Sequence, residues 1–127
     1  MISRSITGGI LHSFNSGRID AEQIISYVRE TIADKPAEVR EIVEFSDDAV
    51  IDMTIEGLRD VLTVVSREVN RSDIKCTIIY VRPKSPELLP YVTYVLNAIT
   101  TFGETSWIAE SVTEARDIFD SLPPKGV

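Results

Sequence analysis

Few side chains in this sequence have the type and spacing that catalysis requires. The 127 residues include one histidine, His12, and one cysteine, Cys76. Nucleophilic catalysis needs a base beside the nucleophile, and His12 lies in the middle of an expected strand, where a packed or surface role is more usual. Cys76 lies in an apolar run and is interpreted as a small core residue. We therefore expect that the protein is not an enzyme and that it has no cofactor.

Acidic side chains offer the other candidate chemistry. Asp47, Asp48 and Asp52 follow an expected strand, at the end where α/β folds place their binding sites. Their carboxylate oxygens suit Mg²⁺ or Ca²⁺, but their spacing matches no defined ion-binding loop. Acidic connectors are common on protein surfaces, so we predict no metal site here.

The distribution of charge indicates what kind of partner the chain would bind. The net charge is −7, and residues 38–60 hold eight acidic residues against two arginines. This balance argues against a nucleic-acid partner held by phosphate contacts. It favours either a protein partner with a basic surface or an ordinary solvated face.

A second candidate site lies where a helix is expected to begin, near Ser85. Large apolar side chains gather there, which predicts either half-buried core residues or an apolar ligand pocket or dimer surface. The residues concerned are Leu88, Leu89, Tyr91 and Tyr94.

The elements that must position these residues follow from hydrophobic periodicity and turn signals. Gly8 and Gly9 between two short apolar runs predict an antiparallel hairpin. Helices then alternate with strands, which predicts parallel crossovers. The expected fold class is α/β: a mixed five-stranded sheet with four helices, forming a single domain over residues 1–127. The expected strands are 2–7, 10–14, 39–45, 74–81 and 105–109, and the expected helices are 20–34, 54–69, 85–102 and 111–122.

Start and stop signals support these helices. Asp20, with Gln23 three residues later, predicts a capping box. Thr54 and Ser111 are expected N-caps, as is Ser85, which is followed by a proline. Gly103 and the Pro123–Pro124 pair are expected to end the last two helices.

The sequence shows no targeting signal, so we expect a cytoplasmic protein. The N-terminal residues do not form the continuous apolar region of a signal peptide. No apolar run reaches the roughly 20 residues that a membrane span needs. A single cysteine excludes an intramolecular disulfide, and a reducing compartment is the default for such a chain.

Short motifs along nearly the whole chain resemble the SpoIIAA-like group of STAS domains. That fold is shared by bacterial anti-sigma-factor antagonists and the cytoplasmic tails of sulfate transporters. The resemblance implies a STAS-like sheet and a regulatory module that binds proteins. The motifs are Gly17–Asp20, Ile42–Phe45, Asp52–Leu58, Lys75–Ile79 and Glu114–Phe119.

The same resemblance bears on phosphorylation. The family antagonists carry an Asp-Ser-Ser-Gly-Leu type sequence, in which a kinase phosphorylates a serine. Aligned on Gly57, this chain has Thr54, Ile55 and Glu56 in place of the Asp and the two serines. Neither serine position has a hydroxyl, so the usual phosphoacceptor is missing. Thr54 is the nearest hydroxyl, and its role as an N-cap is favoured.

Two functions remain open from the sequence. The first is a non-catalytic regulatory module whose partner-binding residues are Asp47, Asp48, Asp52, Thr54, Glu56 and Gly57. The alternative is a small-molecule or lipid carrier that uses an apolar pocket beside the 85–102 helix. The wider group resembles lipid-binding CRAL-TRIO domains in its arrangement, which supports that alternative. Homodimerisation through an exposed apolar flank is a further expectation.

Overall fold

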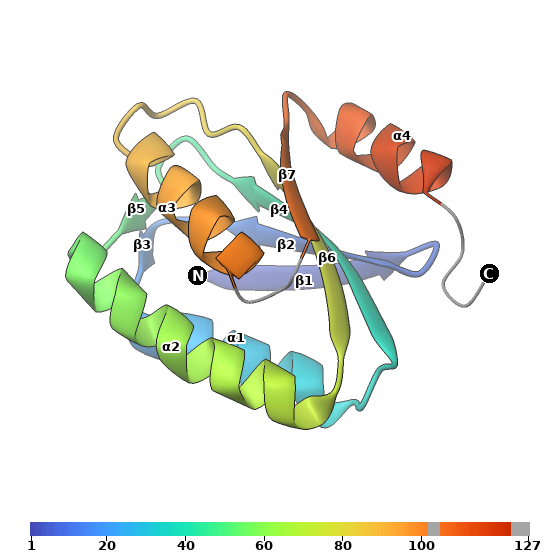
Figure 1. The fold of residues 1–127 in the computed structure, drawn as a ribbon. Coiled ribbons are helices and arrows are strands. Elements are labelled where there is room, and N and C mark those ends of the chain that lie inside the picture. The colour runs from blue at the N-terminus through green and yellow to red at the C-terminus, as the bar shows by residue number, and fades with distance from the viewer. Residues whose placement is uncertain (102–104, 123–127) are drawn as a thin grey trace.

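The structure, a computed structural model, describes residues 1–101 and 105–122. A mixed sheet forms the centre of the fold, with α1, α2 and α3 on one face and α4 on the other (Figure 1). The last residue of the third expected helix, Phe102, and the expected helix ends at Gly103 and at Pro123–Pro124 lie outside the described residues.

The main sheet has five strands in the order β1-β2-β4-β6-β7. β1 and β2 are antiparallel, and the other pairs are parallel, which confirms the predicted α/β class. Gly8 and Gly9 form the turn between β1 and β2 with φ of 60° and 77°, the positive values that a tight hairpin turn requires. The strands are β1 (Ile2–Thr7), β2 (Ile10–Asn15), β4 (Glu38–Phe45), β6 (Lys75–Val81) and β7 (Thr105–Ala109).

A small second sheet was not expected from the sequence. β3 (Arg18–Ile19) pairs in parallel with β5 (Val50–Ile51). Two residues are too few to show an alternating pattern, so sequence periodicity has no means of finding such strands. The pair fixes the loop after β4 beside the start of α1.

The four helices follow the predicted order, and three of them begin at the predicted caps. Asp20, Thr54 and Ser111 each accept a hydrogen bond from the backbone N–H three residues later. The capping box at Asp20 is half formed, because the Gln23 side chain donates to the carbonyl of Arg18 instead of accepting from Asp20. The helices are α1 (Ala21–Ala33), α2 (Ile55–Ser72), α3 (Leu89–Thr101) and α4 (Val112–Ser121).

The third helix begins four residues later than the sequence indicated. Ser85–Leu88 forms a turn, in which the Leu88 N–H donates to the Ser85 carbonyl at 3.2 Å. Pro90 has no N–H to continue a helix that begins at Ser85, but proline is tolerated in the first turn of a helix, where the backbone N–H has no partner. The helix therefore begins where Pro90 falls within its first turn.

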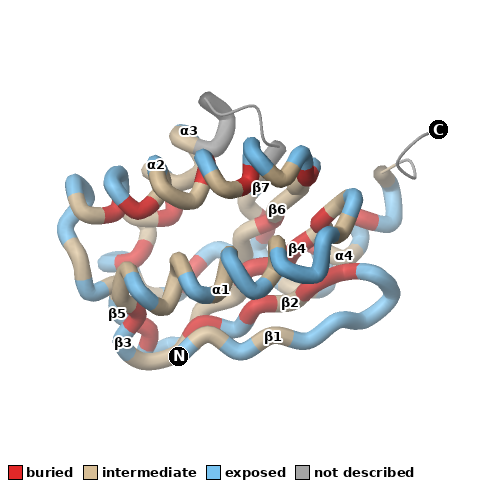
Figure 2. The backbone as a smooth tube through the Cα atoms, turned by 90° about the horizontal axis from the view of Figure 1, so that it is seen from below, coloured by how far each residue is buried: buried red, intermediate tan, exposed pale blue. Residues whose placement is uncertain are grey.

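The core lies on both faces of the sheet. Under α4, Phe119 is 2% exposed and packs against Ile42 and Ile79, both 0% exposed. Figure 2 shows that buried residues are concentrated on β2 and β4. On the opposite face, no residue of α1 is fully buried. The one buried residue of β6, Ile79, packs under α4, so β6 buries none of its residues on this face. This incomplete burial has its explanation in a cavity described below.

Within residues 1–101 and 105–122, no helix combines the length and apolar character needed to cross a bilayer.

Candidate functional site

The predicted partner-binding residues lie on one stretch of surface, residues 46–57, which we call the acidic segment. It leaves β4, forms β5 and ends in the first turn of α2. The side chains of Asp47, Asp48, Asp52 and Glu56 are exposed, as the sequence predicts for a docking surface. Glu41 belongs to the same acidic run of sequence but lies in the interior, 7% exposed, so it adds no charge to this surface.

Hydrogen bonds hold the first part of the acidic segment in place. Asp48 accepts from the Gly17 N–H at 3.3 Å and from the Ser46 hydroxyl. The Ser46 hydroxyl and, to a smaller extent, the Gly17 N–H lower the pKa of Asp48, because both stabilise its charged form. The loop therefore presents an ionised carboxylate in a defined position.

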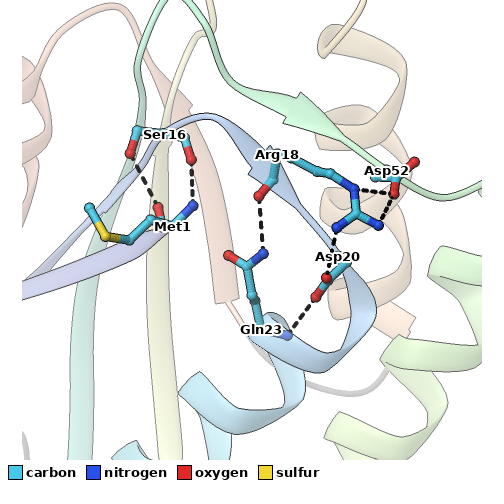
Figure 3. A network of polar contacts seen from close by, with 6 residues as sticks. All are labelled: Met1, Ser16, Arg18, Asp20, Gln23 and Asp52. Carbon is cyan, nitrogen blue, oxygen red and sulfur yellow. Dashed lines mark hydrogen bonds and ion pairs between the residues drawn. The ribbon is translucent and has the colours of Figure 1, made fainter.

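Arg18 anchors the second part (Figure 3). Its guanidinium pairs with Asp52 and also lies 3.3 Å from the carboxylate of Asp20. Hydrogen bonding from the Gln23 N–H, followed by the charge of Arg18, lowers the pKa of Asp20, although partial burial opposes the shift. Because Arg18 pairs with Asp52, the charge of Asp52 is partly neutralised. The negative charge that a partner would meet comes mainly from Asp47, Asp48 and Glu56.

The start of α2 completes the acidic segment. Thr54 Oγ1 accepts from the Gly57 N–H at 3.0 Å, so the hydroxyl nearest in sequence to Glu56 serves as the N-cap. Glu56 lies in the first turn, where the helix dipole favours a negative charge. Among the described residues, no three acidic, histidine or cysteine side chains are grouped as a metal site would require.

A cavity of about 190 Å³ lies between the sheet and α1, α2 and α3. Val39, Glu41 and Val43, which alternate along β4, face it from the sheet. Inward-facing residues of the three helices form its other walls, and they are almost all apolar. The cavity explains why the inner residues of α1 and β6 are only partly buried.

The predicted pocket residues divide into two pairs. Leu88 and Tyr91 line the cavity, whereas Leu89 and Tyr94 are half-buried and are not among its described lining residues. The Tyr91 hydroxyl donates to the carbonyl of Met53 at 2.6 Å. Since Met53 lies in the acidic segment, this bond joins the wall of the cavity to the candidate partner surface.

Three neighbouring polar residues of the lining form what we call the polar floor: Ser13, Tyr27 and Glu41. The other polar residues of the lining are Asn15, Thr31, Ser66, Tyr80 and Tyr91. The Ser13 hydroxyl, 0% exposed, donates to Glu41 Oε2 at 2.8 Å. The Tyr27 hydroxyl is buried beside Ser13 and Glu41, and its contacts with them fall short of good hydrogen-bond geometry. Burial, and then the nearby Glu41 carboxylate, raise the pKa of Tyr27, so it stays a neutral hydroxyl.

Sequence reasoning missed the polar floor. The alternation of β4 was a usable signal, because it places Glu41 on the same face as Val39 and Val43. A glutamate in the middle of an apolar strand face is unusual enough to suggest a role. Tyr27 gave no comparable signal, since an aromatic residue on an apolar helix stripe is ordinary core.

The histidine considered for catalysis lies away from the cavity. His12 Nε2 is 2.9 Å from Glu44 Oε1, and both side chains project from the opposite face of the sheet. This placement fits the interpretation of His12 as a strand residue held by a neighbouring carboxylate.

Comparisons with known proteins bear on the fold. No protein-family model matches this sequence, and no curated protein matches it in sequence. A solved structure of the anti-sigma factor antagonist SpoIIAA in its unphosphorylated form does match, with a TM-score of 0.52 and 16% identity. The match covers 96% of this chain and 100% of that chain. The chain therefore has the STAS fold of SpoIIAA, as its sequence motifs predicted.

Proposed function

We propose that this chain is a non-catalytic protein-interaction module that meets a basic partner through the acidic segment. The observation that carries this proposal is a set of exposed carboxylates, Asp47, Asp48 and Glu56, on an anchored backbone. Besides the bonds to Asp48, the Val50 N–H donates to Gly17 and the Asp52 N–H to Ile19, each at 2.8 Å. A surface that is already ordered loses little conformational entropy on binding.

The structural neighbour supports a protein partner. SpoIIAA is named as an antagonist of an anti-sigma factor, which is a protein that acts on another protein. Control of binding would differ in this chain, because Ile55 and Glu56 replace the two serines of the family motif. Glu56 has a single negative charge at one of these positions, whereas a phosphoserine would have nearly two.

Charge removal tests the acidic segment. We expect the triple variant Asp47→Asn, Asp48→Asn, Glu56→Gln to lower affinity for the partner about tenfold, because rim charges steer and orient association. Asparagine retains an oxygen that can accept from Gly17, so the loop should keep its shape. The partner would be identified by cross-linking and mass spectrometry at low salt, and its affinity for both proteins measured by calorimetry.

A matched control separates the acidic segment from net charge. The triple variant Glu22→Gln, Glu87→Gln, Asp117→Asn removes the same charge from exposed positions elsewhere. It should bind the partner as the wild type does. Equal losses of affinity in the two triple variants would contradict the proposed surface.

The cavity supports a second candidate function, a carrier of small apolar molecules. An engineered protein cavity of about 150 Å³ is known to accommodate benzene, and this one measures about 190 Å³. Pockets for drug-sized ligands are larger, about 300–1,000 Å³. The size therefore favours a molecule of one ring over a lipid with long chains.

Native mass spectrometry tests this second function directly. Freshly purified protein is expected to carry a small added mass that disappears on denaturation, because unfolding removes the cavity that holds the ligand. An unmodified mass, together with no binding of toluene in solution, would exclude the carrier function and leave the partner-binding proposal unaffected.

A further inference from the structure

We propose that the outer edge of β1 pairs with the same edge of a second copy of this chain. The two strands run antiparallel about a two-fold axis at Arg4, and the two main sheets become one continuous sheet. Neither function proposed above is needed for this pairing. β1 is the terminal strand of the order β1-β2-β4-β6-β7, and Figure 2 shows it along one rim of the molecule.

The hydrogen bonds of the first hairpin determine which backbone groups of β1 point outward. Met1 and Ser16 form a reciprocal pair, in which each backbone nitrogen donates to the carbonyl of the other residue. Such bonded pairs occur at every second position of an antiparallel ladder. The residues of β1 that bond to β2 are therefore Ser3, Ser5 and Thr7. Those that direct their N–H and C=O groups away from β2 are Ile2, Arg4 and Ile6. No strand among the described residues takes up these outward groups.

The sequence of β1 is symmetric about Arg4, since residues 2–6 read Ile-Ser-Arg-Ser-Ile in both directions. A two-fold contact places residue i opposite residue j and residue j opposite residue i. With Arg4 on the axis, Ile2 lies opposite Ile6 of the second copy, and Ser3 lies opposite Ser5. Apolar pairs and hydroxyl pairs both stabilise neighbouring strands. The sequence is therefore complementary to itself in this register.

The backbone also selects this register over its neighbours. An axis at Ser3 or Ser5 would need backbone groups that are already bonded to β2. An axis at Ile2 or Ile6 would pair fewer of the outward residues. With the axis at Arg4, every outward residue of β1 exchanges two backbone hydrogen bonds with the second copy.

The pairing would cover apolar surface that is exposed in the single chain. Ile6 is 71% exposed, the largest exposed fraction among the large apolar side chains described. Ile2, on the same side of the sheet, lines a shallow cleft between β1 and α1 together with Gln23 and Tyr27. Ile6 of the second copy, placed opposite Ile2, would lie against this cleft. Each copy thus supplies a side chain to the surface of the other.

β1 lacks the features that keep edge strands apart. Exposed edges are commonly protected by lysine, proline or a bulge, and β1 contains neither lysine nor proline. Its one charged side chain, Arg4, is directed toward α1 of its own copy. The Arg4 guanidinium donates to the Tyr27 carbonyl at 2.9 Å and to Thr31 Oγ1 at 3.0 Å, and it lies 3.5 Å from the Glu30 carboxylate. The ion pair with Glu30 reduces the repulsion between the two arginines at the axis.

Sedimentation equilibrium of the full chain tests the pairing, together with a substitution at its most exposed residue. From about 10 µM to about 1 mM, the wild type should show a monomer–dimer equilibrium, because an interface of this small size gives weak association. Ile6→Lys should weaken dimerisation about tenfold or more, because lysine protects a strand edge. Ile55→Lys is the matched control: Ile55 is 39% exposed at the start of α2, away from β1, so its change should leave dimerisation as in the wild type.

The register can be checked in the wild type by NMR. A mixture of isotope-labelled and unlabelled chains should give an intermolecular NOE between the Hα atoms of Ser3 and Ser5, whose Cα atoms would lie about 4.5 Å apart. Hydrogen exchange of the Arg4 and Ile6 amides should slow as concentration rises, whereas that of the Ser5 amide, bonded to β2, should not change. A chain that stays monomeric at about 1 mM, a dimer that Ile6→Lys leaves intact, or a dimer without the Ser3–Ser5 NOE would each overturn the proposal.

Discussion

We expect Phe119→Ala to lower the free energy of unfolding by about 3–5 kcal/mol, the usual cost of deleting a buried aromatic side chain. Phe119 is 2% exposed and is the largest fully buried side chain described. It joins α4 to the sheet by packing on Ile42 and Ile79. Domains of this size are stable by about 5–15 kcal/mol, so the variant should lose a large part of its stability.

Urea denaturation followed by circular dichroism measures this loss. Phe14→Ala is the control, since Phe14 is 39% exposed on β2 and its removal should cost less than about 1 kcal/mol. The slope of the transition should stay the same in both variants if each unfolds in two states. If Phe119→Ala lowered the free energy of unfolding no more than Phe14→Ala does, then α4 would not close the core.

The second large effect is expected at the polar floor. Ser13→Ala should lower the free energy of unfolding by about 1–3 kcal/mol, because it removes a donor from a buried carboxyl group. Ser13 is 0% exposed, and its hydroxyl is 2.8 Å from Glu41 Oε2. Serine and alanine differ by a single oxygen, so little packing is lost with the hydrogen bond.

A double-mutant cycle distinguishes this effect from packing. The variant Ser13→Ala, Glu41→Leu replaces both partners with apolar groups, and it should regain more than half of the stability lost in Ser13→Ala. If the two changes are additive, the hydrogen bond does not account for the cost. If the two substitutions couple as expected, a glutamate at position 41 makes the protein less stable than a leucine would. Such a loss of stability is common where a side chain is kept for function.

The topology was predictable because it depends on local signals. Alternation along the strands, the apolar stripes of the helices and the Gly8–Gly9 turn together specify an antiparallel hairpin followed by parallel crossovers. The STAS fold and the three capped helix starts were confirmed. The predicted start of α3 was wrong. Ser85 and the proline after it were interpreted as a helix start, but they belong to a separate turn.

The candidate sites were less accessible to such reasoning. Exposure of Asp47, Asp48 and Glu56 follows from their type, but the Arg18–Asp52 pair that anchors the segment joins residues far apart in the sequence. The cavity is a volume left between three helices and a sheet, and no single stripe of residues records how well the helices fill the space above the sheet. The apolar cluster at the start of α3 indicated part of the cavity, because Leu88 and Tyr91 line it. Glu41, an acidic residue at a core-facing position of β4, was a second usable signal.

The hydrogen bond from Tyr91 to Met53 makes the interior and the outer surface energetically interdependent. Tyr91 belongs to the wall around the cavity, and Met53 immediately precedes the cap of α2. A guest that shifted α3 would therefore change the energy of the loop that we propose as the partner surface. Linkage then requires that the partner alter the guest's affinity by the same factor. If both proposed sites were occupied, each bound molecule would be an effector of the other.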